Sequence, residues 1–146
     1  MVVSDDRPET GLVVRYNFLW PREHDRGERE GRKSRPVCLV VPLNVPERTV
    51  VVFPITRQPP TPGRIAVEIP ETERRRLRLP GNQRSWVMLD ESNGDVMPGS
   101  FHLEPLSYDP VVTAYGRFSP PFMSRVMKVL ADAIRNKQVR VVPRER

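Results

Sequence analysis

The chain alternates short apolar runs with charged or proline-rich segments, a pattern that predicts a protein built mainly from strands. From residue 11 to 20, apolar residues at every second position alternate with more polar ones, so we expect a strand with one buried face. Arg15 and Asn17 fall on its outer face. Residues 36–43 form a continuous apolar run, which indicates a buried strand, and residues 48–56 are predicted to pair with it as an antiparallel hairpin.

Two loops interrupt this pattern. The segment 22–34 is rich in charge, has glycines at positions 27 and 31, and contains no apolar residue that could anchor it to a core, so we expect a flexible loop. Residues 57–63 include three prolines, which cannot donate the backbone hydrogen bonds of a strand, and are predicted to form a second loop.

The following runs are shorter and predict the rest of a sheet. Residues 64–69 alternate apolar and polar and are expected to form a fourth strand, followed by a short helical turn over residues 71–78. Residues 85–89 are predicted to be a fifth strand and residues 101–106 a sixth. Between them, the sequence Asn93-Gly94-Asp95 is typical of a turn.

An amphipathic helix is predicted over residues 120–137. Ser119 can cap its first turn, and proline at position 120 loses no hydrogen bond there. Apolar residues recur along one stripe that is expected to pack on the sheet. They are Phe122, Val126, Val129, Leu130 and Ala133. The basic tail, residues 138–146, is expected to be frayed.

A chain of 146 residues is about the size of one domain, and six short strands favour a mainly β fold, a small barrel with a C-terminal helix. We expect residues 11–106 to form its core. Cys38 is the one cysteine, so no intrachain disulfide is possible and a cytoplasmic protein is expected. No apolar stretch approaches the roughly 20 residues that span a bilayer, which predicts no contact with a membrane.

The charge of the chain indicates its class of partner. A formal net charge of +6 and a pI near 10.2 favour a polyanion, because Lys and Arg that neutralise phosphates release condensed counterions. Charge alone leaves RNA, DNA and an acidic protein as alternatives. Asp90, Glu91 and Asp95 lack accompanying His or Cys ligands, so neither a metal site nor any other cofactor is expected.

Two short motifs carry a resemblance to a known family. Arg35-Pro36 stands at the head of the second predicted strand, and Pro54-Ile55-Thr56 closes the third. In this order and spacing, residues 11–106 resemble the MazF/PemK family of toxin endoribonucleases. The resemblance implies an SH3-like barrel of the MazF/PemK/CcdB kind, a homodimer, and a cognate antitoxin that inhibits it. It also implies metal-independent cleavage of single-stranded RNA, leaving a 2′,3′-cyclic phosphate.

The same resemblance suggests the catalytic residues. In the family, the arginine before proline and the threonine that ends the third strand form the catalytic pair, which corresponds here to Arg35 and Thr56. An arginine suits this reaction because its planar guanidinium contacts two phosphate oxygens and stays charged at accessible pH. The threonine hydroxyl is too weak a base for efficient proton abstraction, so Thr56 is expected to position the phosphate.

Further side chains are expected to contact RNA around this pair. Arginine and lysine side chains would bind phosphates, and Trp86 could stack on a base. Asp90 and Glu91 fall where the family tends to place polar residues of the RNA groove. The complete set of expected RNA contacts is Arg15, Arg32, Lys33, Arg57, Trp86, Asp90 and Glu91.

The chain also departs from the family. Residues 29–34 lack the Gly-x-Glu-Gln-x-Gly motif that the family carries in this loop. Residues 107–118 form an extra segment outside the compact family pattern. Two alternatives therefore stand beside the ribonuclease. One is a non-catalytic SH3-like barrel that binds nucleic acid or protein, and the other is a gyrase-directed toxin of the same fold, which needs no catalytic arginine.

Overall fold

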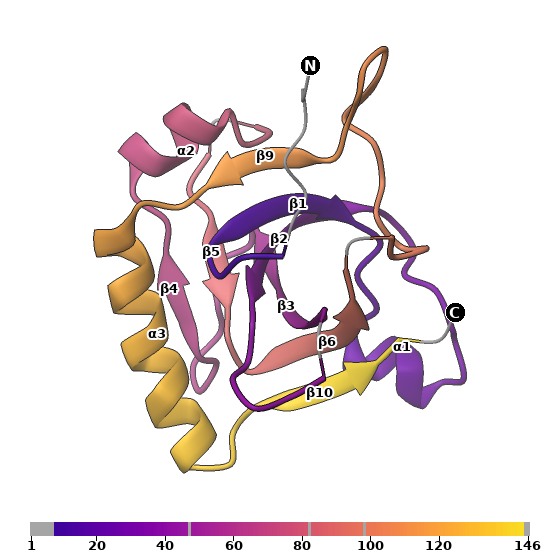
Figure 1. Ribbon diagram of the computed structural model, residues 1–146. Helices are drawn as coiled ribbons and strands as arrows, with labels where there is room; N and C mark the ends of the chain where they lie inside the picture. Colours follow the sequence, from indigo (N-terminus) through magenta and orange to yellow (C-terminus); the bar gives the residue numbers. More distant parts are fainter. Residues whose placement is uncertain (1–7, 47, 82, 98, 145–146) are drawn as a thin grey trace.

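The computed structural model describes residues 8–46, 48–81, 83–97 and 99–144 (Figure 1). The described residues form ten strands and three helices. In chain order these are β1 (Leu12–Tyr16), α1 (Pro21–Asp25), β2 (Arg35–Val40), β3 (Thr49–Thr56), β4 (Ala66–Glu68), α2 (Glu71–Leu77), β5 (Trp86–Met88), β6 (Glu91–Val96), β7 (Ser107–Tyr108), β8 (Val111–Val112), β9 (Ala114–Arg117), α3 (Pro120–Arg135) and β10 (Arg140–Pro143).

Most strands belong to one sheet with the order β10-β6-β3-β2-β1-β9, and β4 and β5 extend it from β3. All its pairs are antiparallel except β10 with β6. The fold is therefore a mixed α/β arrangement with a mostly antiparallel sheet, where the sequence predicts a mainly β barrel. The predicted C-terminal helix is confirmed. The sheet path ends at β10 and at β9, so no closed barrel is formed by the strands that the structure describes.

The two faces of this sheet pack into two apolar clusters. Val13, Cys38 and Phe53 join one cluster, which α3 covers, whereas Val14 and Leu39 join the other. Neighbouring residues separate in this way because successive side chains of a strand point to opposite faces. The second strand is buried on both faces, as its continuous apolar run predicts.

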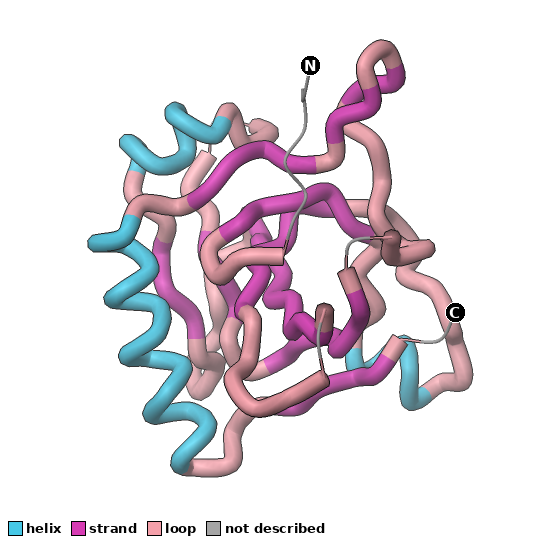
Figure 2. The backbone as a smooth tube through the Cα atoms, viewed as in Figure 1, coloured by secondary structure: helices cyan, strands magenta, loops and turns pink. Residues whose placement is uncertain are grey.

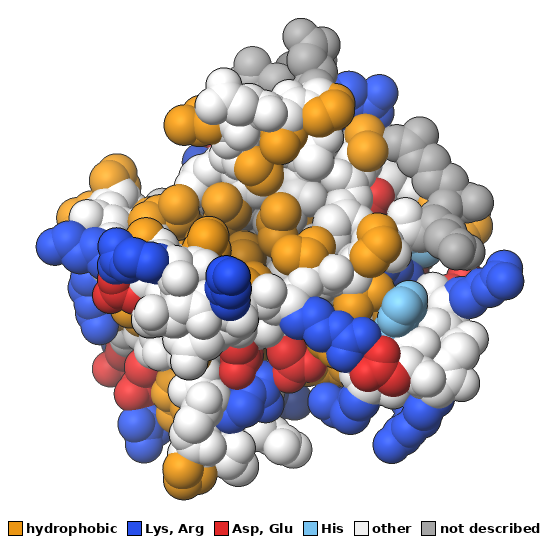
Figure 3. Space-filling view, turned by 90° about the horizontal axis from the view of Figure 1, so that it is seen from below, with side chains coloured by type: hydrophobic (Ala, Val, Ile, Leu, Met, Phe, Trp, Pro, Cys, Tyr) orange, Lys and Arg blue, Asp and Glu red, His pale blue; other side chains and the backbone are white. Residues whose placement is uncertain are grey.

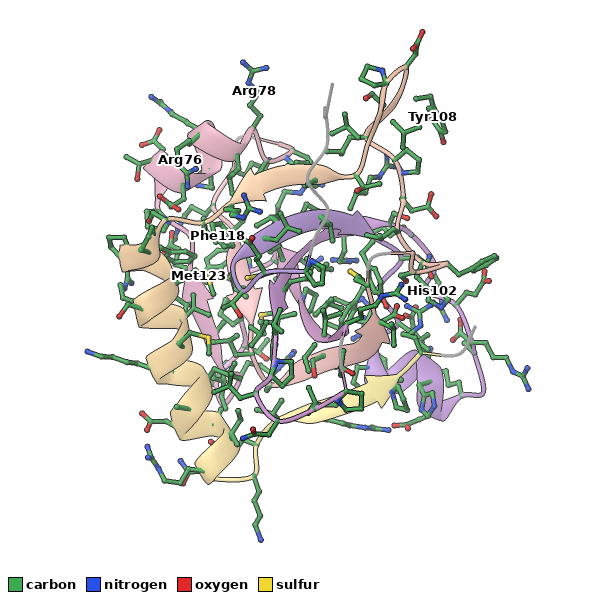
Figure 4. All side chains as sticks on the ribbon, viewed as in Figure 1. Arg76, Arg78, His102, Tyr108, Phe118 and Met123 are labelled. Atoms are coloured by element: carbon green, nitrogen blue, oxygen red, sulfur yellow. The ribbon has the colours of Figure 1, made fainter. Side chains whose placement is uncertain are left out.

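Helix α3 runs along one side of the sheet, next to β4 (Figures 1 and 2). The Ser119 hydroxyl accepts a hydrogen bond from the Phe122 amide at 3.4 Å, which confirms the predicted cap. Phe118 and Met123 lie at the junction of this helix with the sheet (Figure 4). A Cβ at Gly11 would lie 3.1 Å from Cγ of Met123, so the absence of a side chain there permits close packing.

Two predictions for the later part of the chain are wrong. Asn93-Gly94-Asp95 lies inside β6 and forms no turn, because both polar side chains find buried partners: Asn93 Oδ1 accepts from the Leu19 amide at 2.9 Å, and Asp95 accepts from the Tyr16 hydroxyl at 2.7 Å. The tail is not frayed within its described part. Residues 140–143 form β10, and the side chain of Val142 is 1% exposed.

The predicted sixth strand is also absent. Residues 101–106 form no strand, and Phe101 is 76% exposed. Their contribution to the sheet is one isolated bridge from Leu103 to Tyr16. The position beside β1 is taken instead by β9, which belongs to the segment 107–118 that the family pattern does not include. In the same segment, β7 and β8 form a separate hairpin near Tyr108 (Figure 4).

Candidate nucleic-acid groove

A groove of about 1270 Å³ opens at the end of the sheet where β2 begins and β3 ends. It is bordered by the end of β1, by the segment after it, and by the loop that follows β3. Among the residues that the structure describes, one carboxylate, Glu23, lines this groove. The cationic side chains that line it are Arg15, Arg22, Arg32, Lys33, Arg35, Arg57 and Arg64. This excess of positive charge suits a polyanionic ligand.

The course of β2 and β3 explains why the groove lies there. The β2–β3 ladder ends with the pair Val37 and Pro54. Arg35 lies two residues before the first of these and pairs with Tyr16 of β1, whereas Thr56 lies two residues after the second and pairs with Trp86 of β5. The two strands therefore take different partners, and Arg35 and Thr56 both line the groove between them.

The guanidinium of Arg35 is held by an aromatic ring. Its central carbon lies 5.0 Å from the centroid of the Trp20 ring. The Nε atom is buried and has no hydrogen-bond partner among the described residues. Burial lowers the pKa of Arg35, and so does repulsion from Arg22 and Arg57, whereas Glu23 raises it. Arginine nevertheless stays charged near neutral pH.

Thr56 has a simpler environment. Its Oγ1 accepts a hydrogen bond from the Gln58 amide at 3.1 Å, a local contact across the turn that leaves β3. This bond uses one lone pair, so the hydroxyl proton can be donated to a ligand oxygen. The arrangement fits a hydroxyl that positions a phosphate.

Four other predicted RNA contacts, Arg15, Arg32, Lys33 and Arg57, also line the groove. Arg57 lies close against Gly81, where a Cβ would be 2.4 Å from the Nη1 atom of the arginine. Glycine at this position thus makes room for the guanidinium. Arg32 is paired with carboxylates of its own segment, at 3.3 Å from Glu23 and 3.2 Å from Glu28.

The remaining three predicted contacts lie outside the lining of the groove. Asp90 and Glu91 both pair with Arg64, which is a lining residue, so they contribute by fixing this arginine. Trp86 is 7% exposed, because it pairs with two neighbouring strands and Arg84 covers its ring at 5.2 Å. Stacking of a base on Trp86 is therefore excluded in this structure.

The segment 22–34 is more ordered than its composition predicts. It begins within α1, and the Asn17 side chain donates to the Gly31 carbonyl at 2.9 Å and accepts from the Gly31 amide at 2.8 Å. A second anchor is the ion pair between Asp25 and Arg140 of β10. The prediction of an unanchored loop is wrong, because polar side chains hold this segment where apolar ones are absent.

Trp20, Arg22 and Arg64 line the groove but are not among the predicted RNA contacts. Trp20 was expected to pack in the core as part of the first strand, yet it is only partly buried and lines the groove. Arg22 and Arg64 line it as well. The signal that could have found the first two is the spacing Trp20-Pro21-Arg22, in which an aromatic residue at a strand end stands beside a cation.

No protein-family model matches the chain, and a search of the curated proteins found none with significant sequence similarity. In the described part of the chain, no three or more His, Cys, Asp and Glu side chains are grouped so that they could hold a metal ion. None of the described helices has the length and apolar character needed to cross a membrane.

Proposed function

We propose that the protein is a metal-independent endoribonuclease that cleaves single-stranded RNA and is the toxin of a type II toxin–antitoxin system. The observation that carries this proposal is the position of Arg35 and Thr56, which lie on strands that separate and line one cationic groove. The two motifs that resemble the MazF/PemK family thus meet at a site suited to a phosphodiester.

The reaction balances with RNA, these side chains and solvent water, which carries the proton. The 2′-oxygen of the substrate attacks the adjacent phosphorus, and the bond from phosphorus to the 5′-oxygen breaks. The 2′-hydroxyl proton is transferred, in net terms, to the leaving 5′-oxygen, and a 2′,3′-cyclic phosphate remains. Arg35 would stabilise the negative charge that develops on the phosphoryl oxygens, and Thr56 would orient one of them.

We also propose that the fold is of the SH3-like kind. The antiparallel path through β6, β3, β2 and β1, with α3 packed on one side, supports an SH3-like arrangement in the form of an open barrel. Such a toxin would act in the cytoplasm, where its RNA substrate and antitoxin occur.

A homodimer is the expected assembly. Large apolar side chains stand exposed on the surface, among them Leu43 at 87% and Val141 at 47%. Figure 3 shows that hydrophobic side chains gather on the face of the molecule viewed from below, with Lys and Arg side chains around them. Apolar surface of this kind supports a protein partner, which can be a second copy or the antitoxin.

A non-catalytic nucleic-acid binder is the second candidate, because the excess of cations in the groove favours binding whether or not cleavage follows. Incubation of the purified protein with a labelled single-stranded RNA in excess EDTA separates the two. Fragments with 2′,3′-cyclic phosphate ends are expected. Binding without fragments would support the second candidate.

A further inference from the structure

Three arginines that line the groove, Arg22, Arg35 and Arg57, form no ion pair with a carboxylate of the described residues. Burial lowers the pKa of Arg35, and repulsion from Arg22 and from Arg57 lowers it further. Among the described residues, no carboxylate oxygen lies within 4.0 Å of a side-chain nitrogen of any of the three. Glu23 attracts Arg35 but forms no ion pair with it. Three like charges with so little counter-charge favour an anionic ligand that reaches all of them.

Two other arginines of the groove, Arg32 and Arg64, do form ion pairs. Arg32 is paired with Glu23 and Glu28, and Arg64 is paired with Asp90 and Glu91. Those guanidiniums are already neutralised by protein carboxylates. Glu23 is the one lining carboxylate, and its two oxygens accept from the Trp20 amide at 3.0 Å and contact Arg32 at 3.3 Å.

Trp20 takes the place of a carboxylate for two of the three arginines. The central carbons of Arg22 and Arg35 each lie 5.0 Å from the centroid of its ring. The ring itself is fixed, because Phe18 meets it edge-on with centroids 5.0 Å apart and the Trp20 amide is bonded to Glu23. Both cations are thus held by a ring that is itself fixed, at the start of α1.

A cation–π contact positions a guanidinium without neutralising it. The ring attracts the cation through its quadrupole, whereas a carboxylate would occupy two N–H donors and cancel the charge. The donors of both arginines therefore remain available to a ligand. The Nε atom of Arg35 has no partner among the described residues but is buried, so a ligand would be contacted through the other two guanidinium nitrogens.

We propose that Trp20 is a positioning residue that holds Arg22 and Arg35 against its ring, so that together with Arg57 they form one binding site for a phosphodiester of single-stranded RNA. The identity of the ligand rests on the proposed function. Trp20 fixes the geometry of the guanidiniums, and they contact the phosphate.

Binding to a fluorescein-labelled, fully 2′-O-methylated RNA 12-mer of mixed sequence tests this site without cleavage. Arg22→Gln should weaken binding and reduce the slope of log Kd against log salt concentration by about 0.7, the contribution of one phosphate contact in a single strand. Arg78→Gln removes the same charge from a side chain that projects into solvent at the end of α2 (Figure 4) and should leave the slope unchanged.

The role of the ring is tested by a matched pair of variants. Trp20→Leu keeps an apolar side chain without a π face and should weaken binding about tenfold, whereas Trp20→Phe should stay within roughly threefold of the wild type. Equal losses in the two variants, or none in Trp20→Leu, would overturn the proposal. If Trp20→Leu fails to fold, Trp20→Met takes its place, because methionine is also apolar and lacks a π face, and wild-type binding by this variant would contradict the ring's role.

This experiment separates the two proposals. RNA that binds in the expected way but is never cut by the wild-type protein contradicts the ribonuclease and leaves the binding site intact. RNA that is cut, with equal binding by the wild type, Trp20→Leu and Arg22→Gln proteins, contradicts the binding site and leaves the ribonuclease intact.

Discussion

Arg35 and Thr56 lie on neighbouring strands, yet each faces a different third strand: Arg35 pairs with Tyr16 of β1 and Thr56 with Trp86 of β5. Both residues lie beyond the last pair of the β2–β3 ladder, Val37 and Pro54. Proline lacks the N–H that would continue a ladder, and Pro36 and Pro54 stand at this end of the two strands. The sequence motifs that resemble the toxin family thus also form the mouth of the groove.

Thr56→Val should lower the rate of RNA cleavage about tenfold, the effect of one neutral hydrogen bond lost from the transition state. Valine keeps the β-branched shape that suits a strand end, so the fold should be retained. Thr56→Ser is the matched control, because it keeps the hydroxyl. Single-turnover rates at saturating enzyme measure the effect, and equal rates for the valine variant and the wild type would exclude a role for the hydroxyl.

The ionisation of Glu91 should make the stability of the protein depend on pH. Burial raises the pKa of Glu91 above its ordinary value of 4.5, Asp90 raises it further, and Arg64 opposes them. The unfolded chain therefore loses this proton at a lower pH than the folded protein does. As the pH rises above 4.5, ionisation of Glu91 lowers the free energy of unfolding.

Glu91→Gln removes this ionisation. The Tm of the variant, relative to that of the wild type, should rise between pH 4 and pH 7, as measured by thermal unfolding across about that range. A difference in Tm that is flat over this range, or that falls, would contradict the assignment. Glu71→Gln, in an exposed pair with Arg75 on α2, is the comparison for a carboxylate at the surface.

The anchoring of the segment 22–34 can be measured at Gly31. Its amide donates to the Asn17 side chain at 2.8 Å, so it should exchange slowly with solvent in the free protein. Asn17→Ala should increase the exchange rate of this amide while leaving amides of β3 unchanged. Rapid exchange of the Gly31 amide in the wild type would show that the segment is unanchored, as its composition predicts.

The C-terminal strand is held by a buried arginine. Arg144 is 9% exposed, donates to His102 Nδ1 at 2.9 Å and to Asn93 at 3.2 Å, and lies 5.5 Å from the Tyr16 ring centroid. Arg144→Ala should lower the free energy of unfolding by about 3 kcal/mol, because charged hydrogen bonds are lost and buried acceptors remain without a donor. Urea denaturation measures this change. A loss below about 0.5 kcal/mol, the size of an ordinary surface substitution, would contradict it.

Local pattern was enough to predict elements whose apolar faces pack in the core. The hairpin of β2 and β3 and the helix α3 follow directly from their apolar runs and from the Ser119 cap. The failures fall where polar side chains decide the structure. Asn93 and Asp95 suit a turn by composition, but buried partners on β1 and the segment after it draw them into β6.

Some residues of the candidate site could also be predicted from local sequence, and others could not. Arg35 and Thr56 could be predicted because their motifs stand at recognisable strand ends. The role of Trp20 could not, since a tryptophan at the end of an apolar run is expected in the core, and only the three-dimensional arrangement brings Arg22 and Arg35 to its ring. Ion pairs over long sequence distances, such as Arg64 with Asp90, are equally invisible to a local pattern.

We expect Arg35 to stabilise the transition state of metal-independent RNA cleavage. The most direct measurement is the single-turnover cleavage rate of a single-stranded RNA in excess EDTA, compared for the wild type, Arg35→Gln and the surface control Arg78→Gln. The wild type and the control should cleave at equal rates, and Arg35→Gln should be slower by about 10² to 10³, with an unchanged circular dichroism spectrum. Cleavage by Arg35→Gln at the wild-type rate, or wild-type cleavage that needs an added divalent ion, would contradict the account.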